Sequence, residues 1–260
     1  MCITSKEAIL RKTKILSFKK ENGNIFLSYQ NTAQNLSKGR NCMVLPIPGK
    51  LKSEWFFDTT KYSSFMKYLA DRCIVSESTN YGVRSRSMTL GSKGLEVVNV
   101  GMYEIHFSND MNDIKTLNES LNLEIGSDLL EFFINHYKGF SFIYCIFDGN
   151  QKMDSQPIAL EYEPINSNVL FFPTMDGHDG EAPKDDRVSV DHIILTELKN
   201  QRSGKQDLSF INAPEFLDNR EWGGYEISYK MPNGDFYMDL TQNMENPNLT
   251  RNYEIQIQYD

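Results

Sequence analysis

The sequence predicts an α+β fold that is predominantly antiparallel β-sheet, with two groups of short helices. Apolar and polar residues alternate in strand-like fashion along most of the chain. Consecutive strand candidates are joined by short turns, which favours antiparallel pairing. Helical patterns are few, and they fall near residues 59–70 and 110–137. This distribution of elements is typical of the α+β class.

Each element follows from a local pattern. Alternating residues on both sides of Asn22-Gly23 predict an N-terminal hairpin, because Asn-Gly suits the two-residue turns that join antiparallel strands. Apolar residues three and four apart, after a Thr or Ser that can cap the first turn, predict helices. In chain order we expect strands over 13–20, 24–30 and 42–46, a helix from Thr59 or Thr60 through 70, a strand over 95–107, helices over 110–121 and 127–137, and strands over 140–147, 157–162, 169–172, 189–198, 224–230, 235–240 and 253–259.

The length of 260 residues suits one large domain or two small ones. Residues 75–94 are rich in Ser, Gly and Arg and are expected to form a long exposed loop. A polar stretch at 199–209 divides the chain into a main α+β domain over 1–198 and an appended β-rich segment over 199–260. That segment is either a separate layer or part of the same domain.

Composition indicates a folded, acidic protein. The chain is 40% hydrophobic and carries a formal net charge of −8. Its longest apolar run, Phe142–Phe147, is far shorter than the ~20 residues of a membrane helix. Charged residues interrupt the N-terminal apolar positions, so we expect no secretory signal, no membrane association and a cytoplasmic location.

Charge is unevenly distributed. Residues 1–100 hold 16 Lys and Arg against 7 Asp and Glu, whereas residues 101–260 hold 11 against 28. The basic residues are scattered rather than clustered with aromatics, and the acidic total repels a polyanion. The pattern therefore argues against nucleic-acid binding.

Cys2 is the first candidate catalytic residue. The four cysteines show no CxxC pair, so we expect reduced thiols. Removal of Met1 would leave Cys2 with both a thiol and an α-amine, and the amine could accept the thiol proton. An N-terminal cysteine hydrolase would use this pair. The alternative is an ordinary frayed terminus.

The densest acidic segment carries two of the four histidines. His178 and Asp179 lie in a Gly-containing loop, and Asp191 precedes His192. An imidazole here could act as the base for Cys2, with Asp179 or Asp191 orienting it, or His178 and His192 could ligate a metal. The spacing matches no standard metal motif, so a solvated loop with a structural Asp-His pair remains the third interpretation.

Five motifs resemble a group of uncharacterised bacterial proteins that begin Met-Cys. They are Met1-Cys2, Cys42-Met-Val-Leu-Pro46, Leu170-Phe-Phe-Pro-Thr174, His178-Asp-Gly-Glu181 and Asp191-His192. The resemblance covers about residues 1–198, and it implies no activity because none is established for the group.

Three functions follow as hypotheses. The first is a hydrolase or acyl-transfer enzyme acting on an amide or thioester, with Cys2 as nucleophile, its α-amine or His178 as base, and Asp179 or Asp191 as the orienting carboxylate. The second is a non-enzymatic interaction or effector protein with an acidic binding surface. The third is a metal-binding protein that uses His178 and His192. No cofactor is expected, and the partner is a small molecule or a protein.

Overall fold

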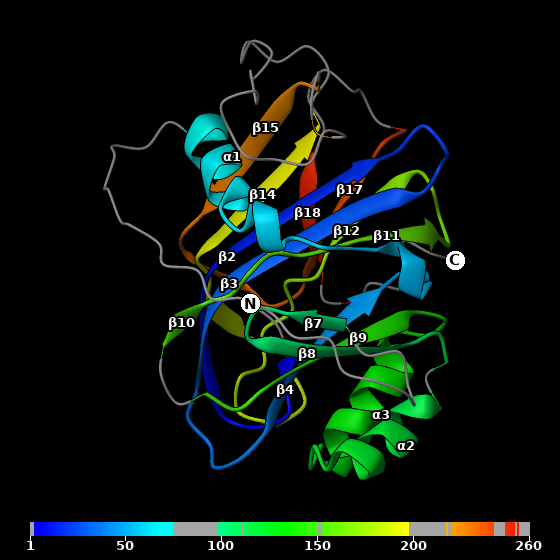
Figure 1. Ribbon diagram of the computed structural model, residues 1–260, viewed down its shortest axis with the longest axis vertical. Coiled ribbons are helices and arrows are strands. Elements are labelled where there is room, and N and C mark those ends of the chain that lie inside the picture. Colours follow the sequence, from blue (N-terminus) through cyan, green and yellow to red (C-terminus); the bar gives the residue numbers. More distant parts are fainter. Residues whose placement is uncertain are drawn as a thin grey trace.

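The computed structural model describes residues 3–74, 98–110, 112–149, 152–197, 217, 220–241, 248–252 and 254. Over these residues the chain is α+β, with mostly antiparallel sheets, which confirms the predicted class. Helix α1 lies at one end of the long axis, and helices α2 and α3 lie at the other (Figure 1). No helix in the described part of the chain is both long and apolar enough to span a membrane.

The largest sheet has eight strands and is built on the predicted N-terminal hairpin. Its order is β15-β14-β2-β3-β11-β5, and β10 and β6 add to β3 and β11. Among the described strand-to-strand pairings, β14 on β2 is the parallel one. The strands are β2 (Ala8–Lys19), β3 (Ile25–Asn35), β5 (Gly49–Lys50), β6 (Phe56–Phe57), β10 (Met153–Asp154), β11 (Ile158–Pro164), β14 (His192–Glu197) and β15 (Trp222–Ile227).

The turn of the β2–β3 hairpin is tied to β11 by a buried carboxylate. Glu161 accepts hydrogen bonds from the side chains of Lys20, Asn22 and Asn24. Burial alone would raise the pKa of Glu161, but these hydrogen bonds lower it below its usual value. The Asn-Gly turn therefore also fixes the position of the neighbouring strand.

A five-stranded sheet packs against the first and runs β1-β4-β9-β8-β7. The strand over 42–46 was expected to end at Pro46, but Pro46 lies inside β4, paired with Phe142. The prediction of one strand over 95–107 was wrong. The described part of this segment forms two strands joined by a turn at Gly101, where φ is +59°. The strands are β1 (Ile3–Thr4), β4 (Asn41–Ile47), β7 (Val98–Val100), β8 (Tyr103–Ser108) and β9 (Ser141–Phe147).

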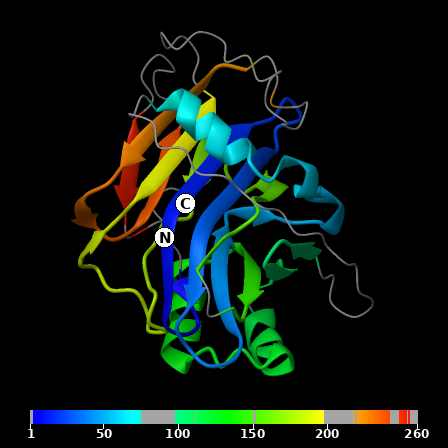
Figure 2. The same cartoon turned by 60° about the vertical axis from the view of Figure 1, so that its left-hand side comes forward.

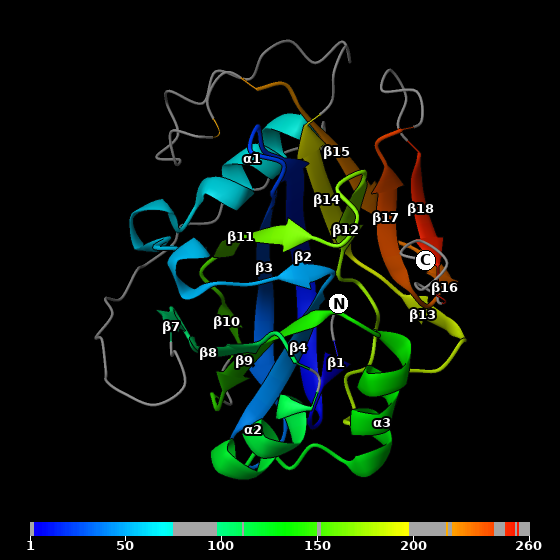
Figure 3. The ribbon, with the colours of Figure 1, turned by 90° about the vertical axis from the view of Figure 1, so that its right-hand side faces the viewer.

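The C-terminal strands join the rest of the fold. In the three-stranded sheet, β17 (Asp235–Asp239) lies between β12 (Val169–Phe172) and β18 (Leu249–Asn252). A two-stranded ribbon pairs β13 (Arg187–Ser189) with β16 (Lys230–Pro232). Figures 2 and 3 show the β12–β17–β18 sheet beside the eight-stranded one.

In the described part of the chain, three α-helices cover the two outer faces. Helix α1 (Phe65–Cys73) packs on the eight-stranded sheet, while α2 (Asp113–Leu121) and α3 (Ser127–His136) pack on the five-stranded sheet. The helix expected from Thr59 or Thr60 was wrong at its start. Residues Thr60–Tyr62 form a separate 3-10 turn, and α1 begins at Phe65 with no side-chain cap. The loop expected over 75–94 lies outside the described residues, as does most of the strand expected over 253–259.

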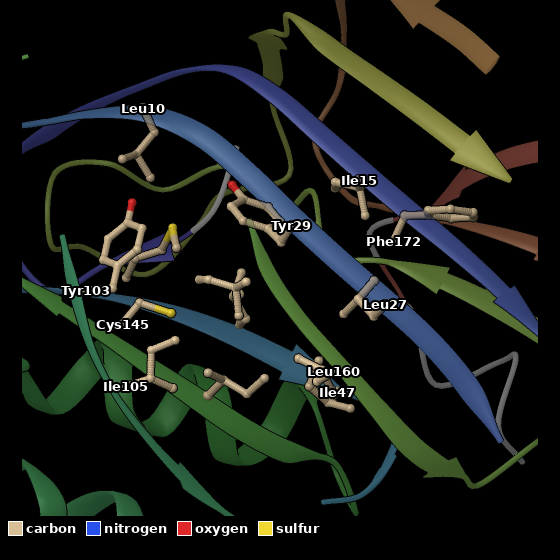
Figure 4. Close-up of a cluster of buried hydrophobic side chains, with 14 of the residues drawn as sticks. Leu10, Ile15, Leu27, Tyr29, Ile47, Tyr103, Ile105, Cys145, Leu160 and Phe172 are labelled. Atoms are coloured by element: carbon tan, nitrogen blue, oxygen red, sulfur yellow. The ribbon is translucent and has the colours of Figure 1, made fainter. Parts of the chain in front are cut away.

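The main hydrophobic core lies between the sheets. Leu10, Ile15, Leu27 and Tyr29 point from β2 and β3 toward side chains of the opposing strands, such as Cys145 (Figure 4). Because alternate residues of a strand face opposite sides, β4 and β9 also supply a second core beneath α2 and α3. The strands of both sheets are therefore buried on two faces, and their nearly continuous apolar runs reflect this.

Candidate functional site

The loop 176–181 lies against the N-terminal strand. The backbone N–H of Thr4 donates to Gly177 O at 2.8 Å, and that of Ala8 donates to His178 O at 2.9 Å. Between these two bonds, Ser5 N–H turns the other way and donates to Cys42 O on β4 at 2.8 Å. The beginning of the described chain thus lies between β4 and the loop. Cys2 lies outside the described residues.

His178 is held in a mostly buried position on this loop. Burial lowers the pKa of His178 to about 3, so the ring is neutral over the physiological range. Its Nε2 lies 3.3 Å from Asp176 Oδ1, but the angles do not make a hydrogen bond. The ring nitrogen is therefore close to a carboxylate without being oriented by it.

Asp176 was not among the candidate residues, although its spacing from His178 offers a signal. Residues two apart on an extended chain project to the same side. Asn233 fixes the segment, because its side chain accepts from Asp176 N–H and donates to Asp176 O, each at 2.9 Å. Burial raises the pKa of Asp176. The buried Asp-His pair of the loop is thus Asp176 and His178.

His192 is a second buried histidine, whose pKa responds to the charge of His178. It begins β14, pairs with Thr13 of β2 and is 1% exposed. Burial holds the pKa of His192 well below its usual value, and the charges of Arg251 and His178 act in the same direction. Arg251 stacks on Phe236 and donates to Thr174 O at 3.3 Å. His178 and Arg251 are thus near enough to His192 to influence its pKa, and the sequence patterns did not indicate the arginine.

Asp179 is exposed and shapes the loop. Its Oδ1 accepts from Glu181 N–H at 3.0 Å, which closes a turn around Gly180. Gly180 has a φ of +84°, and a Cβ there would lie 2.7 Å from Ser5 O. Only glycine allows the loop to approach the N-terminal strand this closely.

Asp191 is engaged by the backbone of β2. Its Oδ2 accepts from Lys12 N–H at 2.9 Å. Lys12 has a φ of +53° and lies where the β2–β3 register shifts between Arg11 and Lys14. The Asp191 carboxylate thus stabilises an irregular strand position, and its described hydrogen bond goes to Lys12.

Within the described residues, no group of three or more His, Cys, Asp or Glu side chains is arranged to hold a metal ion. The metal-binding hypothesis for His178 and His192 therefore gains no support from the geometry. An open hollow of about 620 Å³ lies elsewhere, at the end of β8, and none of the predicted site residues lines it. Its lining is Lys50, Phe107, Ser108, Asn109, Asp110 and Asp113.

The fold is similar to that of solved structures of baculovirus P35. The similarity to the crystal structure of baculovirus P35 has a TM-score of 0.50, with 14% sequence identity, over 95% of this chain and 95% of that one. A mutated P35 after caspase cleavage gives a TM-score of 0.46 at 12% identity, covering 91% and 95%. P35 in its complex with caspase-8 gives 0.45 at 13% identity, covering 91% and 92%. No family model and no curated protein matches the chain.

Proposed function

We propose that this chain is a non-enzymatic effector that binds a protein partner, and that the partner is a caspase-type protease. The observation that carries the proposal is the P35-like fold over 95% of both chains. P35 itself is seen in a complex with caspase-8, and a mutated form is seen after caspase cleavage. A shared fold does not fix a function, so the partner is a proposal to be tested directly.

The geometry around His178 also favours binding over hydrolysis. A general base works best when its pKa lies near the working pH, and a buried ring with a pKa of about 3 holds a proton poorly at neutral pH. The described hydrogen bond of Asp191 goes to Lys12, and that of Asp179 goes to Glu181. Neither carboxylate forms a described hydrogen bond to an imidazole, as an orienting group would.

The test is a binding experiment with purified caspases. The full chain is mixed with each member of a caspase panel and analysed by size-exclusion chromatography, while a fluorogenic peptide reports residual protease activity. We expect co-elution with at least one caspase and a change in its activity that saturates at a fixed molar ratio. A trypsin-like serine protease is the matched control and should neither co-elute nor change. The absence of any complex across the panel contradicts the proposal.

The same assay separates an effector from a hydrolase. An effector acts once per chain, because each molecule is used up when it forms a complex. A hydrolase converts many substrate molecules per chain. Incubation of the chain with model amides and thioesters should therefore release no product beyond the spontaneous rate. Multiple turnovers by the wild-type chain that are lost in a Cys2→Ala variant would instead support the hypothesis of an N-terminal cysteine hydrolase.

A further inference from the structure

The loop 176–181 is attached to the N-terminal strand by few contacts and carries a buried, neutral imidazole. Two backbone hydrogen bonds, from Thr4 and Ala8, join the strand to the loop. Two isolated bridges, Ile3 with Gly177 and Glu7 with Asp179, mark the same contact. The other edge of the strand is bound separately, because Ile3 and Thr4 pair with β4. The part of the loop after Asp176, which Asn233 holds in place, can therefore move away while the strand stays on β4.

We propose that the loop 176–181 is an acid-sensitive latch, which detaches from residues 3–8 when His178 and His192 become protonated. This inference goes beyond the proposed function and does not depend on it. It rests on the buried Nε2 of His178, which has no hydrogen-bond partner, on the burial of His192 and on the alternating hydrogen bonds of the N-terminal strand.

The charges around the two rings disfavour an imidazolium in the closed state. Burial disfavours the charged form of both rings, and the positive charge of Arg251 on β18 and a charge on His178 disfavour it further at His192. The nearest carboxylate is that of Asp176, whose own pKa is raised by burial, so it loses its charge early on acidification. The other described carboxylates around the cluster are Asp179 on the loop, Asp186 near Asp176, Asp191 next to His192 in the chain and Asp235 near Arg251.

The sign of the pH effect follows from proton counting. In the detached state the rings face water and have their ordinary pKa of about 6.5, so they bind protons that the closed state does not bind. Lowering the pH below 6.5 therefore favours detachment. For His178, whose pKa in the closed state is about 3, the opening equilibrium rises about 30-fold at pH 5. His192 adds to this factor, and Asp176 acts in the opposite direction.

Amide hydrogen exchange measures the detachment of the loop at individual residues. Protection factors of the full chain, corrected for the intrinsic rates, are measured at pH 7 and pH 5. We expect the protection of the Thr4 and Ala8 amides to fall at least about tenfold, while the Ser5 amide, which donates to β4, keeps its protection. Equal protection at both pH values overturns the proposal. Loss at Ser5 together with Thr4 and Ala8 also overturns it, since the whole strand then opens.

Variants assign the effect to the two rings. In His178→Gln, the loss of Thr4 and Ala8 amide protection between pH 7 and pH 5 should be smaller than in the wild type. In the double variant with His192→Gln, this loss should vanish. His106→Gln is the matched control, because His106 contacts Glu104 on β8, away from the loop, and should leave the fall unchanged. If the double variant does not fold, NMR titration of the rings in the wild-type chain replaces it. A His178 ring that titrates near pH 6.5 without loss of Thr4 protection refutes the latch.

Discussion

Asp235 joins three parts of the fold, so its replacement is expected to destabilise the chain strongly. The side chain is fully buried at the start of β17. Its Oδ1 accepts from Thr174 N–H at 2.7 Å and from Met175 N–H at 2.8 Å, just after β12. Its Oδ2 accepts from the hydroxyl of Tyr137 at 2.7 Å, just after α3. One carboxylate thus connects the three-stranded sheet to the helical layer.

The size of the effect depends on how many donors lose their acceptor. Asp235→Ala leaves three buried donors unpaired, and removing one partner of a buried charged network costs about 3–5 kcal/mol. Asp235→Asn keeps an oxygen for the two backbone donors, and its amide can donate to the oxygen of Tyr137. We therefore expect Asp235→Asn to lower the free energy of unfolding by only about 1–2 kcal/mol.

Urea unfolding followed by circular dichroism measures both losses. The alanine variant should also melt roughly 10 °C below the wild type, since each kcal/mol shifts the melting temperature of a chain this long by about 2–4 °C. Tyr137→Phe completes a double-mutant cycle, and a coupling energy of about 1 kcal/mol or more is expected with Asp235→Ala. Equal stability of the alanine and asparagine variants, or zero coupling with Tyr137, would refute the role of the carboxylate.

Substitutions at three further positions test local features. Glu161→Gln should lower the free energy of unfolding above pH 4.5, the ordinary pKa of Glu. The difference from wild type should vanish as the pH falls through the lowered pKa of Glu161. A difference in urea unfolding that does not depend on pH would contradict this. Gly49→Ala should lower the free energy of unfolding by more than about 2 kcal/mol, because its Cβ would lie 2.1 Å from the backbone oxygen of Glu163; a thermal melt like that of the wild type would exclude so close a contact. Lys12 has a φ of +53°, which glycine adopts without strain and a β-branched residue does not. Lys12→Gly should therefore leave the free energy of unfolding unchanged or raise it by up to about 1 kcal/mol, whereas Lys12→Val should lower it by about 1–2 kcal/mol. The reverse order in chemical unfolding would disprove the strained backbone.

Local patterns were sufficient for the elements whose two ends carry turn signals. Asn22-Gly23 located the N-terminal hairpin, and the apolar run ending at Phe147 located β9. The patterns failed where tertiary packing overrides propensity. Pro46 lies within β4 beyond Met43 and Val44, the positions that pair with β1, and a missing N–H costs less where a strand has a ladder partner on one side. Gly101 turned one expected strand into a hairpin because its positive φ reverses the chain.

Local sequence patterns also indicated part of the candidate site. The acidic, Gly-containing segment pointed to His178 and His192, and the fold brings both rings into one cluster. Arg251 could not be predicted, because it is separated from His192 by 59 residues and approaches through pairing of β17 with β18. Which carboxylate lies beside which ring is likewise set by long-range contacts, such as those of Asn233 with Asp176.

The parallel pairing of β14 with β2 sets the order in which the chain can fold during synthesis. The β2–β3 hairpin is complete once residue 35 has been made, but the described neighbours on its two sides begin only at Met153 and His192. For most of translation the hairpin therefore presents two long, apolar edges with unpaired backbone groups. Such an intermediate is prone to aggregate and to recruit chaperones until the second half of the polypeptide emerges from the ribosome.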